Sequence, residues 1–144
     1  MMNRDLAIAA TAIYGPRWQS ELSRHLGVND RTVRYWVAGR QVPDGVLAAL
    51  AEAYADRALA VMSNLGMGGQ PMALAVYEND EDLKRITGDE WSAAFHTRIM
   101  QRVAEKTGSS LVTVRADEYF AWLEGSGQEN TPAARTAYGR RVNG

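Results

Sequence analysis

The strongest constraint on the fold is a pair of short helical patterns separated by one glycine, within residues 17–43. The first pattern, RWQSELSRHL, places Trp18 and Leu22 on one apolar face. Gly27 follows, where a residue without a Cβ atom adopts a positive φ easily, and Asn29 is a good N-cap for the second helix. Because the connection is so short, we expect the two helices to cross at a steep angle and the second helix to protrude.

The second helix, within NDRTVRYWVA, divides into two faces at 100° per residue. One face is apolar and includes Val33, Trp36 and Val37. The opposite face carries Arg31, Arg34, Tyr35 and Ala38. Any amphipathic helix divides in this way, but a protruding helix with outward arginines fits the major groove of DNA. That groove admits a helix and displays acceptors that a guanidinium can bridge.

Charge is distributed unevenly along the chain. Residues 17–40 carry five arginines against Glu21 and Asp30, a net charge of +3, whereas residues 67–125 carry six basic and ten acidic side chains, a net charge of −4. The net charge of the whole chain, −1, conceals this difference. Residues 17–40 are therefore better suited than residues 67–125 to bind an anionic partner.

The chain has 144 residues, of which 46% are hydrophobic, enough for one ordinary domain or two very small ones. We predict a mainly α fold with a small α+β C-terminal unit. Residues 1–65 form four helices, GMGGQP (66–71) is a linker, residues 72–125 form a small α/β unit, and residues 126–144 form a flexible tail. A nucleic-acid-binding arm is the alternative for the tail, which carries several arginines.

Two helices complete the first region. Asn3 can cap a helix that ends near Tyr14, and the fourth helix runs over residues 44–65. The fourth helix carries a continuous apolar stripe made of Val46, Leu50, Tyr54, Ala58, Val61 and Leu65. We expect this stripe to pack on the first three helices and then on the second unit, with a dimer seam as the alternative.

The second unit is predicted to follow the order β-α-α-β-α. Its expected elements are a strand at 72–77, a short helix to residue 86, a helix at 89–107, a strand at 111–116 and final helical turns in DEYFAWLEG. Helical connections are long enough for parallel pairing of the strands, although antiparallel pairing stays open. The acidic pair Asp89 and Glu90 is interpreted as the first turn of a helix, where carboxylates meet its dipole favourably.

The stretch QSELSRHLGVNDRTVRYWVAGRQVP resembles the helix-turn-helix of the lambda-repressor and Cro-like (XRE) family. The matching positions are Gln19, Ser23, Gly27, Val33 and Trp36. The pattern YW..GR..VPD is similar to small phage and prophage regulators, of which the anti-CRISPR-associated (Aca) proteins are examples. In one branch of these regulators a strand-helix-helix-strand unit makes the homodimer, and residues 72–116 are predicted to have that order.

The resemblance implies roles for individual side chains. Arg31, Arg34 and Tyr35 become candidates for reading bases, and an arginine that bridges a guanine contributes about 1–3 kcal/mol of discrimination. Residues that flank this face would contact the DNA backbone and set the register: Trp18, Gln19, Thr32, Arg40 and Gln41. The alternative for Arg31 is a surface ion pair with Glu21 or Asp30, an interaction typically below about 1 kcal/mol.

One such helix reads only a few base pairs, and a single module buries too little surface for tight binding to an operator. A two-fold homodimer would set two recognition helices about 34 Å apart, so that the target is double-stranded DNA with an inverted repeat. The resemblance thus implies a transcriptional repressor at its own phage or mobile-element promoter. The alternatives are a protein-interaction module, such as an antitoxin or an inhibitor of a host defence complex, and an RNA-binding protein.

We predict no enzyme, because no motif defines a catalytic acid, base or nucleophile, and we predict no cofactor. The chain has no cysteine and only His25 and His96, which argues against a zinc site. Both histidines are expected at the surface or at its boundary. No apolar run approaches the roughly 18 residues of a membrane span and no secretory signal is visible, so we expect a cytoplasmic protein without membrane contact.

Overall fold

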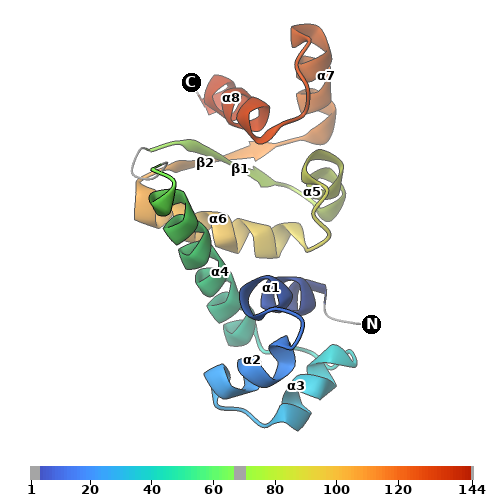
Figure 1. Cartoon of the computed structure of the whole chain (residues 1–144). Helices are drawn as coiled ribbons and strands as arrows, with labels where there is room; N and C mark the ends of the chain where they lie inside the picture. Colours follow the sequence, from blue (N-terminus) through green and yellow to red (C-terminus); the bar gives the residue numbers. More distant parts are fainter. Residues whose placement is uncertain (1–3, 67–70, 144) are drawn as a thin grey trace.

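The structure, a computed structural model, describes residues 4–66 and 71–143 (Figure 1). It is mostly helical, with one parallel sheet of two strands. The elements in chain order are α1 (Arg4–Tyr14), α2 (Trp18–Leu26), α3 (Asp30–Val37), α4 (Asp44–Asn64), β1 (Ala73–Tyr77), α5 (Asp80–Thr87), α6 (Ala93–Thr107), β2 (Ser110–Val114), α7 (Ala116–Ser126) and α8 (Pro132–Asn143). Over the described ranges, no helix combines the length and the apolar character needed to cross a membrane.

Helices α1, α2 and α3 form one end of the molecule, beside the start of α4, where α1 packs on both α4 and α2 and α2 packs on α3 (Figure 1). The core of this end consists of Leu6, Ala9, Ala10, Trp18, Leu22, Val33, Trp36, Val42 and Leu50. Helix α1 buries three residues at the i, i+3 and i+4 spacing of an amphipathic helix. The predicted N-cap of α1, Asn3, lies outside the described residues.

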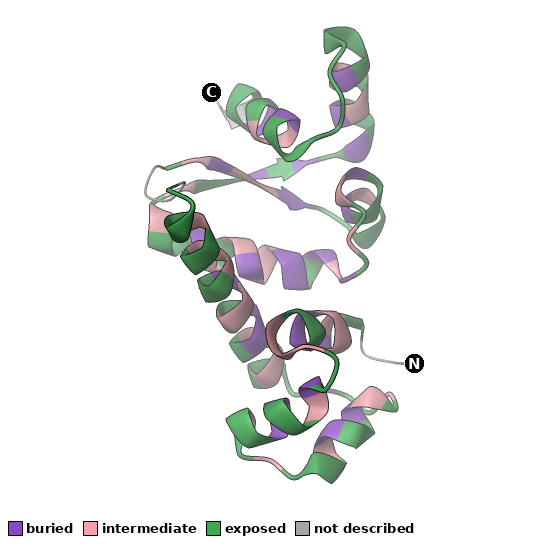
Figure 2. Ribbon diagram, viewed as in Figure 1, coloured by how far each residue is buried: buried purple, intermediate pink, exposed green. Residues whose placement is uncertain are grey.

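Helix α4 connects this end to the rest of the molecule, packing on both α1 and α6. Its buried residues include Ala51 and Ala55, whose small side chains let α6 approach closely. Figure 2 shows that the C-terminal part of α4 is exposed, and Val61 and Leu65 are 51% and 68% exposed. The predicted packing of the apolar stripe is therefore confirmed at Leu50 and wrong at Val61 and Leu65, because the C-terminal turns of α4 extend beyond the helices that cover its start.

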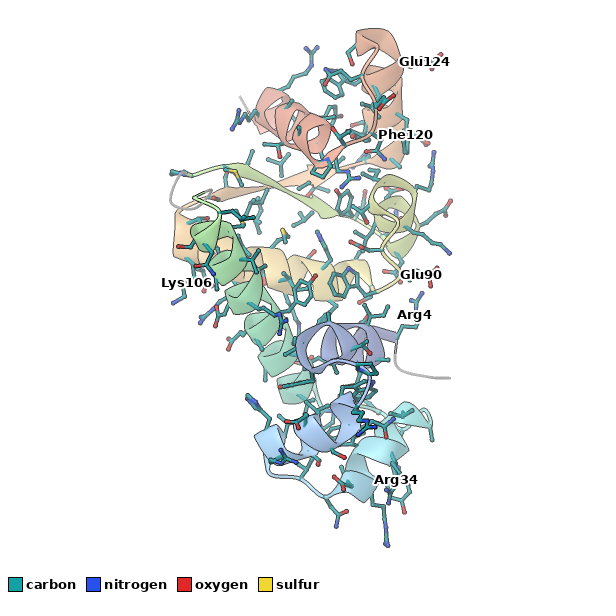
Figure 3. All side chains as sticks on the ribbon, in the orientation of Figure 1. Arg4, Arg34, Glu90, Lys106, Phe120 and Glu124 are labelled. Atoms are coloured by element: carbon teal, nitrogen blue, oxygen red, sulfur yellow. The ribbon has the colours of Figure 1, made fainter. Side chains whose placement is uncertain are left out.

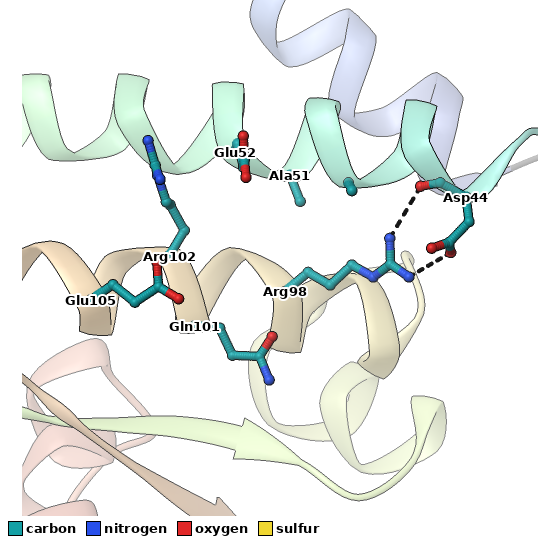
Figure 4. A pocket seen from close by; sticks show the side chains of 8 residues that line it. Asp44, Ala51, Glu52, Arg98, Gln101, Arg102 and Glu105 are labelled. Carbon is teal, nitrogen blue, oxygen red and sulfur yellow. Dashed lines mark hydrogen bonds and ion pairs between the residues drawn. The ribbon is translucent and has the colours of Figure 1, made fainter.

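Ion pairs supplement the contact between α4 and α6. The guanidinium of Arg98 donates to the carboxylate and to the carbonyl oxygen of Asp44 (Figure 4). About one turn of α6 further along, Arg102 Nε lies 3.2 Å from Asp56 Oδ1. These pairs are at the surface, so the buried alanines between them contribute most to the contact.

The second unit has the predicted order strand, helix, helix, strand, helix, and β1 pairs with β2 in parallel. Ala73 faces Ser110 and Tyr77 faces Val114 in the register. Parallel pairing requires a long crossover, which α5 and α6 supply. The two strands lie between α6 and α8 (Figure 1), and both helices contact β1.

Helix α6 begins at Ala93, later than predicted. Ser92 is its N-cap, and the Ser92 hydroxyl accepts a hydrogen bond from the Phe95 backbone N–H at 3.1 Å. Asp89 and Glu90 therefore precede the helix, and their interpretation as its first turn is wrong. A serine cap stabilises a helix start strongly enough to override the weaker preference of acidic residues for that position.

The flexible tail predicted for residues 126–144 is wrong for Pro132–Asn143, which forms α8. Ala134 and Tyr138 of α8 are buried, and Gly139 lies so close to β1 that a Cβ atom there would come within 3.3 Å of the Ala73 carbonyl oxygen. A side chain at position 139 would require α8 and β1 to move apart by a few tenths of an ångström. The composition of this segment did not predict a helix, because only a few, widely spaced residues make the contacts of α8.

The aromatic residues of α7 pack against α8. Tyr119 is fully buried, and its ring centroid lies 5.4 Å from that of Tyr138. Trp122 contacts the same ring at 5.3 Å. Aromatic pairs at such distances contribute beyond their buried area. The predicted linker, residues 66–71, falls mostly outside the described residues, and the division into domains stays a prediction.

Candidate nucleic-acid interface

The turn between α2 and α3 is built from local hydrogen bonds. Gly27 adopts φ +68°, the left-handed conformation that terminates a helix, and the Val28 backbone N–H donates to the Ser23 carbonyl at 3.0 Å. Asn29 then caps α3, because its side-chain oxygen accepts from the Arg31 N–H at 2.8 Å. These bonds confirm the predicted turn and cap, and they fix where α3 begins.

The inward face of α3 is anchored by two side chains. Val33 is fully buried and Trp36 is almost fully buried, as predicted from the helical spacing. The hydroxyl of Ser23 on α2 reaches the carboxylate of Asp30 at the start of α3. Ser23 is itself buried, and its hydroxyl also lies 2.9 Å from the Ser20 carbonyl oxygen, so this polar group is satisfied within the turn. The orientation of α3 on α2 is thus determined by packing and by one buried polar contact.

Trp18 belongs to this core and is only 7% exposed. The resemblance made it a candidate for contacting the DNA backbone, and its burial leaves little side-chain surface for such a contact, which stays a prediction. Its indole packs inward because Trp18 and Leu22 lie one turn apart on the apolar face of α2. A tryptophan at the start of a short helix adds more stability as part of the core than it would at the surface.

The outward face of α3 carries Arg31, Arg34 and Tyr35, all exposed. Tyr35 is 43% exposed, and Figure 3 shows Arg34 pointing away from the body of the molecule at its α3 end. Over the ranges that the structure describes, neither arginine takes part in an ion pair. The alternative pairing of Arg31 with Glu21 or Asp30 is absent in those ranges. Glu21 instead pairs with Arg24 at 3.3 Å.

Tyr35 and Arg40 form a unit. The Arg40 guanidinium carbon lies 4.4 Å from the centroid of the Tyr35 ring, and the Arg40 N–H donates to the Tyr35 carbonyl at 3.0 Å. A guanidinium over an aromatic ring is held by a cation–π interaction. The loop after α3 is therefore attached to the exposed face of the helix, and it adds a positive charge beside Tyr35.

Three further predicted residues lie around this face. Gln19 and Thr32 are half-buried, and Gln41 is exposed. Sequence reasoning counted Arg17 in the local charge but did not assign it a role. Arg17 is exposed at the N-cap position of α2, directly before Trp18. Its charge and its place at a helix N-terminus were the signals that could have identified it.

Helices α1 and α2 meet at an aromatic pair beside this surface. The Tyr14 and His25 ring centroids are 6.0 Å apart in an edge-to-face arrangement. Partial burial and the nearby carboxylate of Glu21 raise the pKa of the Tyr14 hydroxyl above its ordinary value. Tyr14 therefore stays neutral at physiological pH and adds no negative charge to the arginine-bearing end.

His25 is exposed as predicted, but His96 is 8% exposed and the prediction for it is wrong. His96 lies on the face of α6 toward β1, and its ring is 5.4 Å from that of Tyr77. In residues 4–66 and 71–143, no three His, Asp or Glu side chains gather as metal ligands would. The absence of a metal and of a cofactor stays a prediction.

No protein-family model matches the chain, and no curated protein is similar enough to count as a relative.

Proposed function

We propose that the protein is a sequence-specific DNA-binding transcriptional repressor that acts as a homodimer on an inverted repeat, at its own phage or mobile-element promoter. The observation that carries this proposal is the outward face of α3, where Arg31 and Arg34 are exposed and take part in no ion pair among the described residues. Surface arginines without partners do little for the fold. They are suited to bind an anion or a base edge.

The proposed mode of binding inserts α3 into the major groove as the recognition helix of an XRE-type helix-turn-helix. Arg31 and Arg34 would bridge acceptors of guanine, and Tyr35 would contact a neighbouring base edge. Gln19, Thr32, Arg40 and Gln41 would contact phosphates, and we add Arg17 to this group because its exposure and charge suit it. Phosphate contacts set register, so these residues affect affinity more than sequence preference.

Rigidity of α3 supports this mode. Base reading requires side chains that project from a rigid backbone. Asn29 caps the start of α3, and the buried Trp36 anchors its C-terminal half in the core. The bond from Arg40 to Tyr35 orders the loop that follows. Repression needs only occupancy of the promoter, so the proposed function requires no catalytic chemistry.

An exposed aromatic surface at residues 119–123 would favour the main alternative, a protein-interaction module. Tyr119 and Leu123 are buried, and Phe120 and Trp122 are half-buried. Helix α8 contacts this segment. Because the segment already has a partner inside the chain, the observation that would favour this alternative is missing, and we favour the repressor.

The experiment that tests the proposal is a gel shift with the purified protein and the DNA directly upstream of its own gene, against random DNA at about 150 mM salt, where nonspecific binding is weak. A complex that protects an inverted repeat in footprinting is the expected result. Binding no tighter than to random DNA would contradict the proposal. The variant Arg34→Ala then distinguishes base reading, which lowers specific binding alone, from phosphate contact, which lowers both.

A further inference from the structure

A cavity of about 380 Å³ lies far from α3, against β1. Residues of β1, of α6 and of the start of α8 line it, and no β2 residue is among them. The cavity therefore lies on the β1 side of the two-strand sheet. Its volume falls within the range of about 300–1,000 Å³ that is usual for sites binding small molecules.

The walls combine apolar and charged groups. Leu74 of β1 and Met100 of α6 supply an apolar surface, and both are half-buried. Asp89, before α6, and Arg135 of α8 also line the cavity. Within the described ranges, neither of these two takes part in an ion pair. Two opposite charges therefore border one cavity without neutralising each other directly.

Hydrogen bonds fix the side chain of Arg135. Its Nε donates to the side-chain oxygen of Asn130 at 3.1 Å. The same oxygen accepts from the buried Tyr119 hydroxyl at 2.7 Å, and the Asn130 amide donates to the Ile86 carbonyl at 2.7 Å. This network holds the guanidinium through Nε, and a side-chain hydrogen bond links Arg135 to Tyr119 as well. A guanidinium has five N–H donors, so donors remain for a planar anion, a partner that arginine favours.

Asp89 is positioned by its backbone, whose N–H donates to the Thr87 hydroxyl at 3.1 Å. Its negative charge acts on His96, where it partly opposes the lowering of the imidazole pKa by burial. Burial raises the pKa of the Tyr77 hydroxyl to about 12. His96 and Tyr77, which also line the cavity, are therefore neutral hydrogen-bonding groups at physiological pH.

His96 adds an independent sign of a binding site. It is almost fully buried, and its Nδ1 atom has no hydrogen-bond partner in the described part of the chain. A buried nitrogen without a partner costs free energy, and such groups call for an explanation. Here the imidazole lies at the wall of a cavity large enough to hold a ligand.

We propose that this cavity binds a small zwitterion, specifically a free α-amino acid with an apolar side chain. The carboxylate of the ligand pairs with Arg135, its ammonium group pairs with Asp89, and its side chain packs between Leu74 and Met100. A ligand with one charge would leave the other wall charge without a partner, and an uncharged ligand would leave both. The inference does not rest on DNA binding, and its test contains no DNA.

The test is calorimetric titration of the full chain with L-leucine and L-methionine. Two analogues of leucine serve as matched controls, isoamylamine without the carboxylate and 4-methylpentanoate without the ammonium group. We expect at least one amino acid to bind, and its singly charged analogues to bind at least about tenfold more weakly, because each loses one charge-assisted contact. Absence of binding by both amino acids, or equal binding by an analogue, would overturn the proposal.

Substitutions of the charged cavity residues test where the amino acid binds. Arg135→Met and Asp89→Asn should each weaken amino-acid binding about tenfold or more, whereas Arg140→Met, at an exposed position of α8 outside the cavity lining, should bind as the wild type does. Unchanged binding by both cavity variants would contradict the assignment of the site.

A measurement on the wild type covers the case in which these variants fail to fold. The chain has two histidines, so the imidazole NMR signals can be assigned with His25→Gln. Addition of the amino acid should shift the signals of His96 and leave those of His25 in place. A shift at neither histidine would overturn the proposal.

Discussion

The two ends of the molecule use basic side chains differently. In the unit that contains the sheet, several are paired with carboxylates, such as Arg85 with Asp117 at 3.0 Å and Arg115 with Glu78 at 3.3 Å. At the α2–α3 end, Arg24 is paired with Glu21, while Arg31 and Arg34 face solvent and take part in no ion pair among the described residues. The two ends therefore differ more in whether their basic side chains form ion pairs than in their net charge.

The two ends also differ in what orders them. Helices α2 and α3 are ordered by bonds between residues close in sequence, such as the cap of Asn29. The order of α8 depends on contacts with β1, more than fifty residues earlier in the chain. Local hydrogen bonds persist when distant parts of the molecule change, whereas long-range contacts form only in the complete fold. The following variants test these differences, from the largest expected effect to the smallest.

Trp36→Ala should lower the free energy of unfolding by about 3–5 kcal/mol, because a buried aromatic anchor is replaced by a cavity. Trp91→Ala, in the other region, is the matched control and removes an indole stacked at 5.5 Å on Phe95. Urea denaturation measures both. Where both variants remain folded, only Trp36→Ala should lose DNA binding. Loss of DNA binding in both would show that the two ends are not independent.

Arg34→Ala should leave stability nearly unchanged and reduce discrimination between specific and random DNA by about 1–3 kcal/mol, the worth of one bidentate base contact. The control is Arg115→Ala, which removes an arginine that is also exposed, and that pairs with Glu78, from the other end. Fluorescence anisotropy with the two DNAs gives the ratio of dissociation constants. An equal effect of the two variants would mean that general charge, not the α3 face, determines binding.

Asn29→Ala and Asn79→Ala remove the same kind of cap from α3 and from α5, where the asparagine oxygens accept N–H bonds at 2.8 Å each. Each should lower the free energy of unfolding by about 1 kcal/mol. Only Asn29→Ala should also weaken DNA binding, because it loosens the start of α3, the proposed recognition helix. Thermal unfolding and anisotropy separate these effects, and weaker DNA binding by Asn79→Ala would contradict the assignment to α3.

Lowering pH should destabilise the protein through His96, because burial holds the pKa of its imidazole in the folded state below the unfolded value of about 6.5. The unfolded chain then binds more protons below that pH, so stability falls as pH drops through about 6.5 and continues to fall until the folded pKa is reached. His96→Gln should remove this component of the pH dependence. The matched variant His25→Gln should retain it, and loss of the component in both would exclude His96 as its source.

Many local features of the fold could be predicted from sequence. Gly27, Asn29 and the spacing of Val33 and Trp36 define α2, α3 and their turn, because capping and helical periodicity act over about four residues. The strands and their order were predicted for the same reason. The candidate DNA-reading face followed from helical geometry, so Arg31, Arg34 and Tyr35 lie on one exposed surface as expected.

Only the tertiary structure decided which surfaces meet. The parallel pairing of β1 with β2, the order of α8, and the burial of His96 all depend on long-range contacts. Such contacts leave no periodic signal in the segments that make them, as the glycine that lets α8 approach β1 illustrates. The sequence by itself thus determined the local elements and the charge on α3. Packing between distant segments determined the sheet, the buried histidine and the cavity, because their stability comes from surfaces that only the folded chain brings together.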